Sequence, residues 1–190
     1  MSDLRVHKTK YINETKRVSF KYDGKNYFGY EGDTLASALL ANGVHLIGRS
    51  FKYHRPRGIM SCGSEEPNAI CQISDKNDLT EPNVRATELE IYDGLEAFSQ
   101  NCWPNVKFDI GGINNLISPL IPAGFYYKTF MWPKSFWKKV YEPLIRMSAG
   151  LGKSPTEPDP DIYDHKYVHY DVLVIGGGLS GIISAKIAAK

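Results

Sequence analysis

Three glycines near the end of the sequence have the spacing of a dinucleotide-binding turn. Gly176, Gly178 and Gly181 follow the apolar residues 172–175 and precede a helix-forming segment, within VLVIGGGLSGIISAKIAAK. In such a turn the first glycine permits the tight bend, the second lets the backbone approach a pyrophosphate, and the third allows close helix-to-strand contact. The N-terminus of the following helix faces the anion. These glycines are therefore the predicted cofactor-binding residues, rather than a merely structural turn.

The same fingerprint expects an acidic residue about 20 positions further on, where it would bind the ribose hydroxyls. The chain of 190 residues ends before that position. One strand and one helix cannot form a buried parallel sheet, because each face needs covering and the strand needs neighbours. We therefore expect a fragment of a longer protein. Residues 167–190 would be the start of a truncated dinucleotide-binding domain of the Rossmann type, unable to bind a dinucleotide tightly by itself.

The cysteines and histidines predict no metal site. Cys62, Cys71 and Cys102 lack the C-x4-C-x2-C spacing and the fourth cysteine of a plant-type iron–sulfur site, so no cluster is expected. This sparse, odd set also indicates reduced thiols rather than a disulfide framework. His165 and His169 have the spacing of a zinc pair on a helix, but the stretch around them is strand-like, which would separate them. Because no base is placed beside Cys102 or any serine, no catalytic residue is predicted.

A basic and aromatic loop, GRSFKYHRPRG, allows two interpretations. Its arginines could hold a phosphate or a carboxylate through bidentate contacts. Alternatively the loop is an interdomain clamp, in which arginines pair with Glu65 and Glu66 of the same loop region; this interpretation is favoured. The side chains concerned are Arg49, Phe51, Lys52, Tyr53, His54, Arg55 and Arg57.

The N-terminal part predicts the elements of a β-grasp. Residues 17–31 alternate apolar and polar side chains on either side of Asp23-Gly24, which indicates a hairpin. Asp33 is the expected N-cap of a helix over TLASALLANG, Gly43 its expected end, and AICQIS a returning strand. The helix would pack on the hairpin through Leu35, Leu39 and Leu40. We predict an α+β fold in which residues 1–80 form a β-grasp domain of the 2Fe-2S ferredoxin-like type.

Residues 81–152 predict an irregular and helical connector, with a few short strands before residue 124. Within SFWKKVYEPLIRMSAGLG the apolar residues recur at helical spacing, as Phe136, Val140 and Leu144 do. Pro143 should kink or divide this helix. Ser135 is its expected cap, and Gly150 or Gly152 its expected end. The proline-rich residues 153–166 are the expected linker to the last domain.

The overall composition excludes several classes of protein. With 42% hydrophobic and 23% charged residues, the chain is not disordered as a whole. A formal net charge of +2, with scattered basic residues, argues against a nucleic-acid partner. No apolar run is long enough to cross a membrane, and no signal peptide begins the chain, so we expect a cytoplasmic protein with a small-molecule substrate.

Three segments in this order closely resemble the N-terminal part of the alpha subunit of heterotetrameric sarcosine oxidase. They are YEGDTLASALLANGVHLIGRSFKYHRPRGIMSCGSEEPNAICQI, MWPKSFWKKVYEPLIRMSAGLG and DVLVIGGGLSGIISAKIAAK. The likeness runs from about Arg17 to the end of the chain. It implies a ferredoxin-type β-grasp domain without a cluster, followed by a dinucleotide-binding domain that carries NAD, while the folate-binding domain of the family is missing. Cys62 departs from the small residue expected there.

The resemblance implies an enzyme complex that oxidatively demethylates sarcosine. A flavin accepts hydride from the N-methyl amine, and the one-carbon unit passes to tetrahydrofolate. In the family FAD belongs to the beta subunit, FMN lies between the alpha and beta subunits, and gamma and delta subunits complete the complex. Only Gly176, Gly178 and Gly181 are carried over as cofactor contacts. The alternatives are a related flavin amine dehydrogenase of the opine, proline or cyanide-forming glycine type, and a non-catalytic binding or assembly module.

Overall fold

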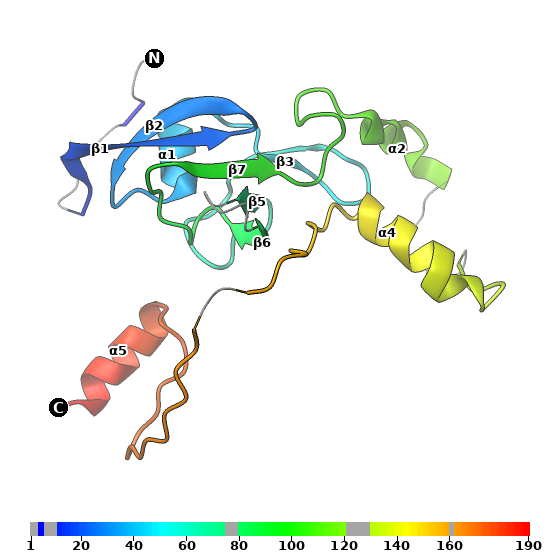
Figure 1. The fold of residues 1–190 in the computed structure, drawn as a ribbon. Helices are drawn as coiled ribbons and strands as arrows, with labels where there is room; N and C mark the ends of the chain where they lie inside the picture. Colours follow the sequence, from blue (N-terminus) through cyan, green and yellow to red (C-terminus); the bar gives the residue numbers. More distant parts are fainter. Residues whose placement is uncertain (1–3, 6–10, 75–79, 121–129, 160–161) are drawn as a thin grey trace. The chain divides into compact units, whose positions relative to one another are not determined.

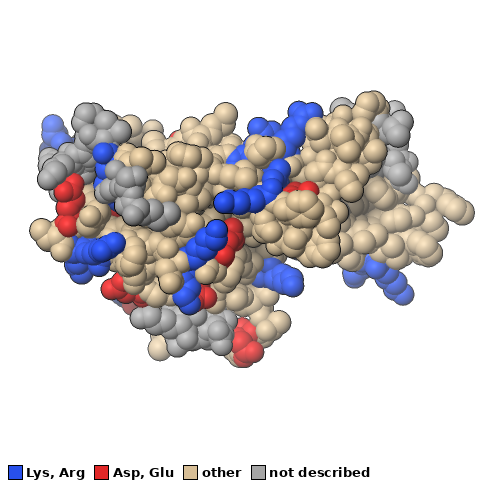
Figure 2. Space-filling model, turned by 90° about the horizontal axis from the view of Figure 1, so that it is seen from above, with Lys and Arg blue, Asp and Glu red and all other residues tan. Residues whose placement is uncertain are grey.

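A computed structural model describes residues 4–5, 11–74, 80–120, 130–159 and 162–190 (Figure 1). The chain divides into two units, Met1–Glu157 and Pro158–Lys190, which are described separately. On the face drawn in Figure 2, Lys and Arg lie in separate patches among uncharged and acidic side chains. No helix in the described ranges is both long enough and apolar enough to span a membrane.

The predicted hairpin is confirmed. Strand β1, Asn13–Tyr22, pairs antiparallel with β2, Lys25–Glu31. The two residues between them, Asp23 and Gly24, have positive φ angles of 47° and 73°. This is the backbone that a two-residue hairpin turn of type I′ requires, and it explains why Asp-Gly stands there. The alternation also determines the faces, because Val18, Phe20 and Tyr22 are buried while their neighbours in β1 are exposed.

The hairpin belongs to a five-stranded sheet in the order β2-β1-β7-β5-β6. Strand β5, Ile70–Ser74, confirms the returning strand predicted over AICQIS. Strands β6, Thr80–Arg85, and β7, Leu95–Ser99, agree with the few short strands predicted before residue 124, whose bounds were not predicted. Central β7 runs parallel to β1 and antiparallel to β5. The sheet therefore continues past residue 80, where the β-grasp domain was predicted to end. The prediction ended too early because β7 offers only a short alternation of inward side chains, which is a weak strand signal.

Helix α1, Leu35–Ala41, covers one face of this sheet (Figure 1). Thr34 is its N-cap, since the Thr34 hydroxyl accepts the backbone N–H of Ser37 at 3.2 Å. The prediction that Asp33 caps the helix is wrong, although it was one residue away. Gly43 ends the helix as predicted, with a positive φ of 74°. Of the three leucines expected in the core, Leu40 is instead exposed at 38%.

Asp33 has a different role, which is to bind the Arg5 side chain. Its carboxylate is completely buried and accepts hydrogen bonds from Arg5 Nη1 at 2.9 Å, from the Tyr30 N–H at 2.9 Å and from the Ser37 hydroxyl at 2.7 Å. A buried carboxylate needs such partners to offset its lost hydration. The Asp33 carboxylate therefore binds Arg5, which is far away in the sequence, in addition to the Ser37 side chain of α1.

Beyond the sheet the chain forms short helices and a two-stranded ladder. β3, Gly48–Arg49, pairs with β4, Pro56–Arg57, in the basic loop. The short helical elements after β7 are η1 (Ile110–Gly112), α2 (Ile113–Leu116) and η2 (Ser118–Leu120).

The predicted long helix is divided at Pro143, as expected. A π-helical stretch η3, Trp137–Tyr141, leads into α4, Glu142–Ser148. Proline lacks an N–H and is tolerated in the first turn, which is where Pro143 lies in α4. Phe136 precedes η3 without any side-chain cap, so the predicted capping role of Ser135 is wrong. Gly150 follows α4 with a positive φ of 66°.

The unit Pro158–Lys190 contains helix α5, Leu179–Ala188. Residues 172–175 form no strand, contrary to the prediction, and Val172 and Ile175 are 60% and 89% exposed. A strand exists only through hydrogen bonds to a neighbouring strand, whereas a helix makes its bonds internally. The described residues supply no neighbour for 172–175.

Candidate functional site

The glycine turn has the local geometry that its spacing predicts. Gly176 has a positive φ of 110°, a backbone conformation that favours glycine. A Cβ placed on Gly181 would lie 2.0 Å from the carbonyl oxygen of Gly176, so a side chain there would displace the turn. Gly178 is the N-cap of α5, and a Cβ there would meet no atom within 4 Å. The turn is thus closed on its inner side by Gly181 and open at Gly178.

This arrangement can present backbone N–H groups to an anion. The first N–H groups of a helix have no partner inside the helix, and the helix dipole adds partial positive charge at the same end. At α5 the Gly178 carbonyl accepts the N–H of Ile182 at 3.0 Å, which leaves the preceding N–H groups of the first turn for a ligand.

The basic loop is fastened to residues 103–115 through several of its side chains. Arg49 donates from Nε to the Val106 carbonyl at 2.8 Å and from Nη2 to the Lys107 carbonyl at 3.0 Å. Arg55 Nε donates to the Asn115 side-chain oxygen at 2.9 Å. The contacts support a clamp rather than a ligand role for these two residues. The acceptors differ from the predicted Glu65 and Glu66, and the contacts lie within the unit Met1–Glu157 instead of between domains.

His54 and Asp109 form a pair that the sequence did not indicate. His54 Nδ1 lies 2.7 Å from Asp109 Oδ2, and the Asp109 side chain is completely buried. The second oxygen, Oδ1, accepts the N–H groups of Trp103 at 2.9 Å and Gly111 at 3.2 Å, which fixes the carboxylate. Because the two residues are 55 positions apart, no local spacing could have revealed them. The pair lines a broad cleft of 1470 Å³ bordered by α4 and residues 150–157.

Glu66 organises the loop that follows strands β3 and β4. Its side chain accepts the N–H groups of Met60 at 2.7 Å and Ser61 at 2.6 Å on Oε2, and those of Asn68 at 2.8 Å and Ala69 at 3.3 Å on Oε1. The residue is only 1% exposed. Burial raises the pKa of the Glu66 carboxyl, but the four N–H groups together lower it by more. The resulting pKa lies below the ordinary value. Glu66 is therefore an internal anion around which the loop folds.

The cysteines do not fit the plant-type cluster. Cys62 is exposed, whereas Cys71 is completely buried among apolar core residues. Burial raises the pKa of the Cys71 thiol to about 12, while metal ligation requires the thiolate. Cys102 is half-buried, and its Sγ lies 3.2 Å from the Ser99 hydroxyl. Across the described ranges no three His, Cys, Asp or Glu side chains gather as a metal site.

The paired histidines also remain apart from any site. Residues 165–169 lie in a stretch without helix or strand, and both His165 and His169 are exposed. The strand-like conformation expected there is absent, for the same reason as at residues 172–175. Two exposed histidines without a helix between them do not form a zinc pair.

Comparison with known proteins gives matches for both units. A family model described as "2Fe-2S iron-sulfur cluster binding domain" matches residues 15–102, which include all of β6 and β7. Sarcosine oxidase subunit alpha of Rhizobium meliloti (strain 1021) is 54% identical over 190 residues, covering 100% of this chain and 19% of that protein. Sarcosine oxidase subunit alpha of Corynebacterium sp. (strain P-1) is 32% identical over 181 residues, covering 94% of this chain and 14% of that protein.

A solved structure of L-proline dehydrogenase from P. horikoshii matches 50% of this chain and 17% of its own, at 23% identity and a TM-score of 0.37, and no inference follows from it. The chain spans 19% or less of the length of the curated relatives named here. Their likeness nevertheless extends through the β-grasp sheet, the divided helix and the glycine turn. The chain is thus homologous along its whole length to part of the alpha subunit of sarcosine oxidase, which confirms the resemblance found in the sequence.

Proposed function

We propose that this chain is the N-terminal part of the alpha subunit of a flavin-dependent oxidoreductase that oxidatively demethylates sarcosine, with transfer of the one-carbon unit to tetrahydrofolate. The observation that carries this proposal is the 54% identity over 190 residues to a protein named sarcosine oxidase subunit alpha. Identity of this extent covers both units of the chain, and not only the dinucleotide fingerprint, which many unrelated enzymes share.

In the proposed enzyme Gly176, Gly178 and Gly181 hold the pyrophosphate of NAD. What supports this role is the turn itself, in which Gly176 has a positive φ of 110° and the inner face has no room for a side chain at Gly181. The N–H groups at the start of α5 would face the phosphate oxygens. The remainder of the alpha subunit would supply the neighbouring strands and the acid for the ribose.

The flavins belong to the larger assembly in this proposal. FAD and FMN would accept the hydride of the N-methyl amine in the complete complex, and no residue of this chain is assigned to that chemistry. The partners would be beta, gamma and delta subunits, in a cytoplasmic complex that acts on a small molecule. The contribution of this chain is to provide the β-grasp domain and the beginning of the NAD site.

The activity is tested by expressing the full-length alpha subunit together with its three partner subunits and measuring oxygen uptake. We expect turnover of sarcosine that depends on the flavins, with a higher kcat/KM than for L-proline, an opine or glycine. A preference for one of those three substrates would instead assign the complex to a related amine dehydrogenase. A folded complex that oxidises none of them would leave the chain as a binding or assembly module.

The NAD site is tested separately with Gly178→Val in the same complex. Because a Cβ at Gly178 meets no atom within 4 Å, the substitution should fold normally and only obstruct the approach of the pyrophosphate. We expect NAD binding to weaken by about 5- to 150-fold, as an overpacking cost of about 1–3 kcal/mol implies. A structurally matched control is Leu179→Val, which changes the next residue, exposed at 77%. Equal NAD affinity in Gly178→Val and wild type would remove this glycine from the site.

A further inference from the structure

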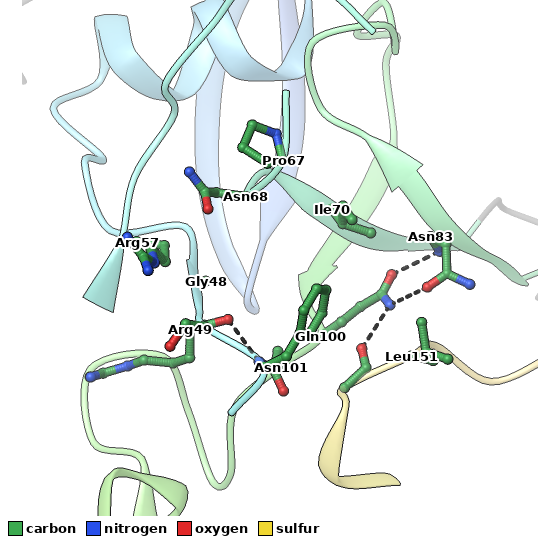
Figure 3. A pocket seen from close by; sticks show the side chains of 13 residues that line it. Gly48, Arg49, Arg57, Pro67, Asn68, Ile70, Asn83, Gln100, Asn101 and Leu151 are labelled. Atoms are coloured by element: carbon green, nitrogen blue, oxygen red, sulfur yellow. Dashed lines mark hydrogen bonds between the residues drawn. The ribbon is translucent and has the colours of Figure 1, made fainter. Parts of the chain in front are cut away.

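A small pocket lies between strands β3 and β4, the start of β5 and residues 150–151, all within the unit Met1–Glu157 (Figure 3). Its volume is 260 Å³, which is just below the range of about 300–1000 Å³ that small-molecule sites occupy. It shares Gln100, Asn101, Gly150 and Leu151 with the broad cleft at His54. Arg57 and Asn68 line this pocket but not that cleft. A pocket of this size suits a molecule much smaller than a dinucleotide.

The lining of this pocket carries net positive charge. Two arginines, Arg49 and Arg57, contribute to it, and no acidic side chain is among the described residues that line it. The Arg49 guanidinium is hydrogen-bonded to main-chain carbonyls, so its charge is not neutralised by a carboxylate. The Arg57 guanidinium forms no hydrogen bond or ion pair within the described part of the chain. Arg57 is therefore the arginine of the basic loop that makes no side-chain contact of this kind with the described residues, unlike Arg49 and Arg55.

Asn68 adds a further hydrogen-bond donor to the lining of the pocket. Figure 3 shows Arg57 and Asn68 on the same side of the pocket, opposite Gln100 and Leu151. Asn68 is held in place because its backbone N–H donates to Glu66 Oε1 at 2.8 Å, while its side-chain amide has no hydrogen bond to any described residue. A guanidinium and an amide on the same side offer several N–H groups to one acceptor group, the pattern that binds carboxylates and phosphates.

Part of the lining is apolar. Phe51 and Leu151 border the pocket and are 53% and 46% exposed, and Ile70 contributes from β5. Exposed apolar side chains beside a polar anchor are typical of sites in which a few polar groups orient an otherwise apolar ligand. An inorganic ion would leave these surfaces in contact with water, whereas an organic anion would cover them.

We propose that this pocket binds a small organic anion, a carboxylate or a phosphate monoester, whose charged group contacts Arg57 and Asn68 and whose apolar body lies against Phe51 and Leu151. The planar guanidinium of arginine matches both kinds of anion through paired N–H donors. The site uses neither the glycine turn nor the flavins, so it goes beyond the proposed function and can fail or hold independently of it.

The proposal is tested by titrating the 190-residue chain with benzoate, phenyl phosphate and inorganic phosphate, using amide and side-chain NMR shifts as the readout. We expect saturable binding of one of the aromatic anions with shifts at Asn68 and Gly48, and at least tenfold weaker binding in Arg57→Gln. The tighter of the two aromatic probes identifies the charged group. Phe51→Ala should weaken the aromatic probes and leave inorganic phosphate unaffected.

Arg55→Gln is the matched control, because it removes the same charge two positions away. The Arg55 side chain contacts Asn115 and lies over the Tyr53 ring at 4.9 Å, and it does not line the pocket. The affinity of the Arg55→Gln variant for the probes should stay within twofold of that of the wild type. The proposal is overturned if neither aromatic probe saturates by about 10 mM, which is weaker than any specific small-molecule site of interest. It is equally overturned if Arg55→Gln weakens binding as much as Arg57→Gln, since the attraction would then be general.

Discussion

The two units of this chain contain similar apolar side chains in opposite environments. In Met1–Glu157 the side chains of Leu35, Leu39 and Leu95 are completely buried. In Pro158–Lys190 those of Ile175 and Ile187 are 89% and 66% exposed. Burial thus depends on which neighbours the chain provides, and not on how apolar a segment is. The first unit has a helix on its sheet, whereas the second has one helix and no described sheet.

The second unit also separates two kinds of local order. Helix α5 forms while its side chains are exposed, because its hydrogen bonds join residues four apart in the same segment. Residues 172–175 are at least as apolar, yet they form no strand, because strand hydrogen bonds need a second segment. The glycine turn between them keeps its predicted bend. Structure that depends on sequence neighbours is present in this unit, and structure that depends on distant residues is absent.

The largest expected consequence is a difference in proteolysis. Lys166 lies in a stretch without helix or strand, whereas Lys21 lies in β1 between β2 and β7. Cleavage after Lys21 requires global unfolding, which for a stability of 5 kcal/mol or more makes it at least about a thousandfold slower than cleavage after Lys166. Brief trypsin digestion with mass spectrometry measures both sites.

Lys153 serves as an internal comparison for this digestion. Its N–H and carbonyl are both hydrogen-bonded to the Gln72 side chain, at 3.0 Å and 3.2 Å, so it should be cut later than Lys166. The folded unit would then extend slightly beyond Gly152. Simultaneous appearance of fragments cut in β1 would contradict the contrast between the units.

The next effect compares the same kind of substitution in the two units. Leu39→Ala removes a completely buried side chain from the core and should lower the free energy of unfolding by about 2–5 kcal/mol. Ile183→Ala removes a side chain that is 48% exposed on α5 and should change it by less than about 0.5 kcal/mol. Urea denaturation followed by fluorescence measures both. A comparable loss in Ile183→Ala would show that α5 is packed in solution.

A smaller effect concerns Glu66. In Glu66→Gln an NH2 group replaces one carboxylate oxygen and faces backbone N–H donors that it cannot accept. We expect the free energy of unfolding to fall by about 3 kcal/mol near neutral pH. Because the folded pKa lies below the ordinary value of 4.5, the contribution of Glu66 is fully present above that pH and decreases as pH falls through the folded pKa. In denaturation curves measured between pH 7 and pH 3, the stability difference between wild type and variant should therefore be constant above pH 4.5 and decrease below it. A pH-independent difference would contradict the role of the ionised carboxylate.

The smallest effect tests which residue caps α1. Thr34→Ala removes the hydroxyl that accepts the Ser37 N–H and should cost about 1 kcal/mol, the usual contribution of an N-cap. Thr34→Ser retains the hydroxyl and should restore most of that stability. Thermal unfolding of the two variants measures the difference. If Thr34→Ala is as stable as wild type, Asp33 caps the helix after all.

Several features of the fold could be predicted because short stretches determine them. Asp23-Gly24 predicts the hairpin turn, and Gly43 predicts the end of α1. Pro143 predicts the division of the connector helix. A few short strands were predicted before residue 124, but the bounds of β6 and β7 and their places in the sheet could not be recognised in the same way. The inward side chains of β7 are only Leu95 and Ala97, and its place in the sheet depends on pairing with β1 and β5.

The candidate sites show the same difference between features that short stretches determine and features that depend on distant residues. The spacing of Gly176, Gly178 and Gly181 determined the bend and the close approach, since both involve atoms within a few residues. The sequence also determined the hairpin, α1 and the family likeness.

Only the tertiary structure decided that Glu66 gathers the N–H groups of its loop, that His54 meets Asp109, and that Arg57 lacks a partner among the described residues while Arg49 has several. The reason is physical. A buried charge takes whichever partners the folded chain brings within hydrogen-bond distance, and those partners are not encoded by their spacing in the sequence.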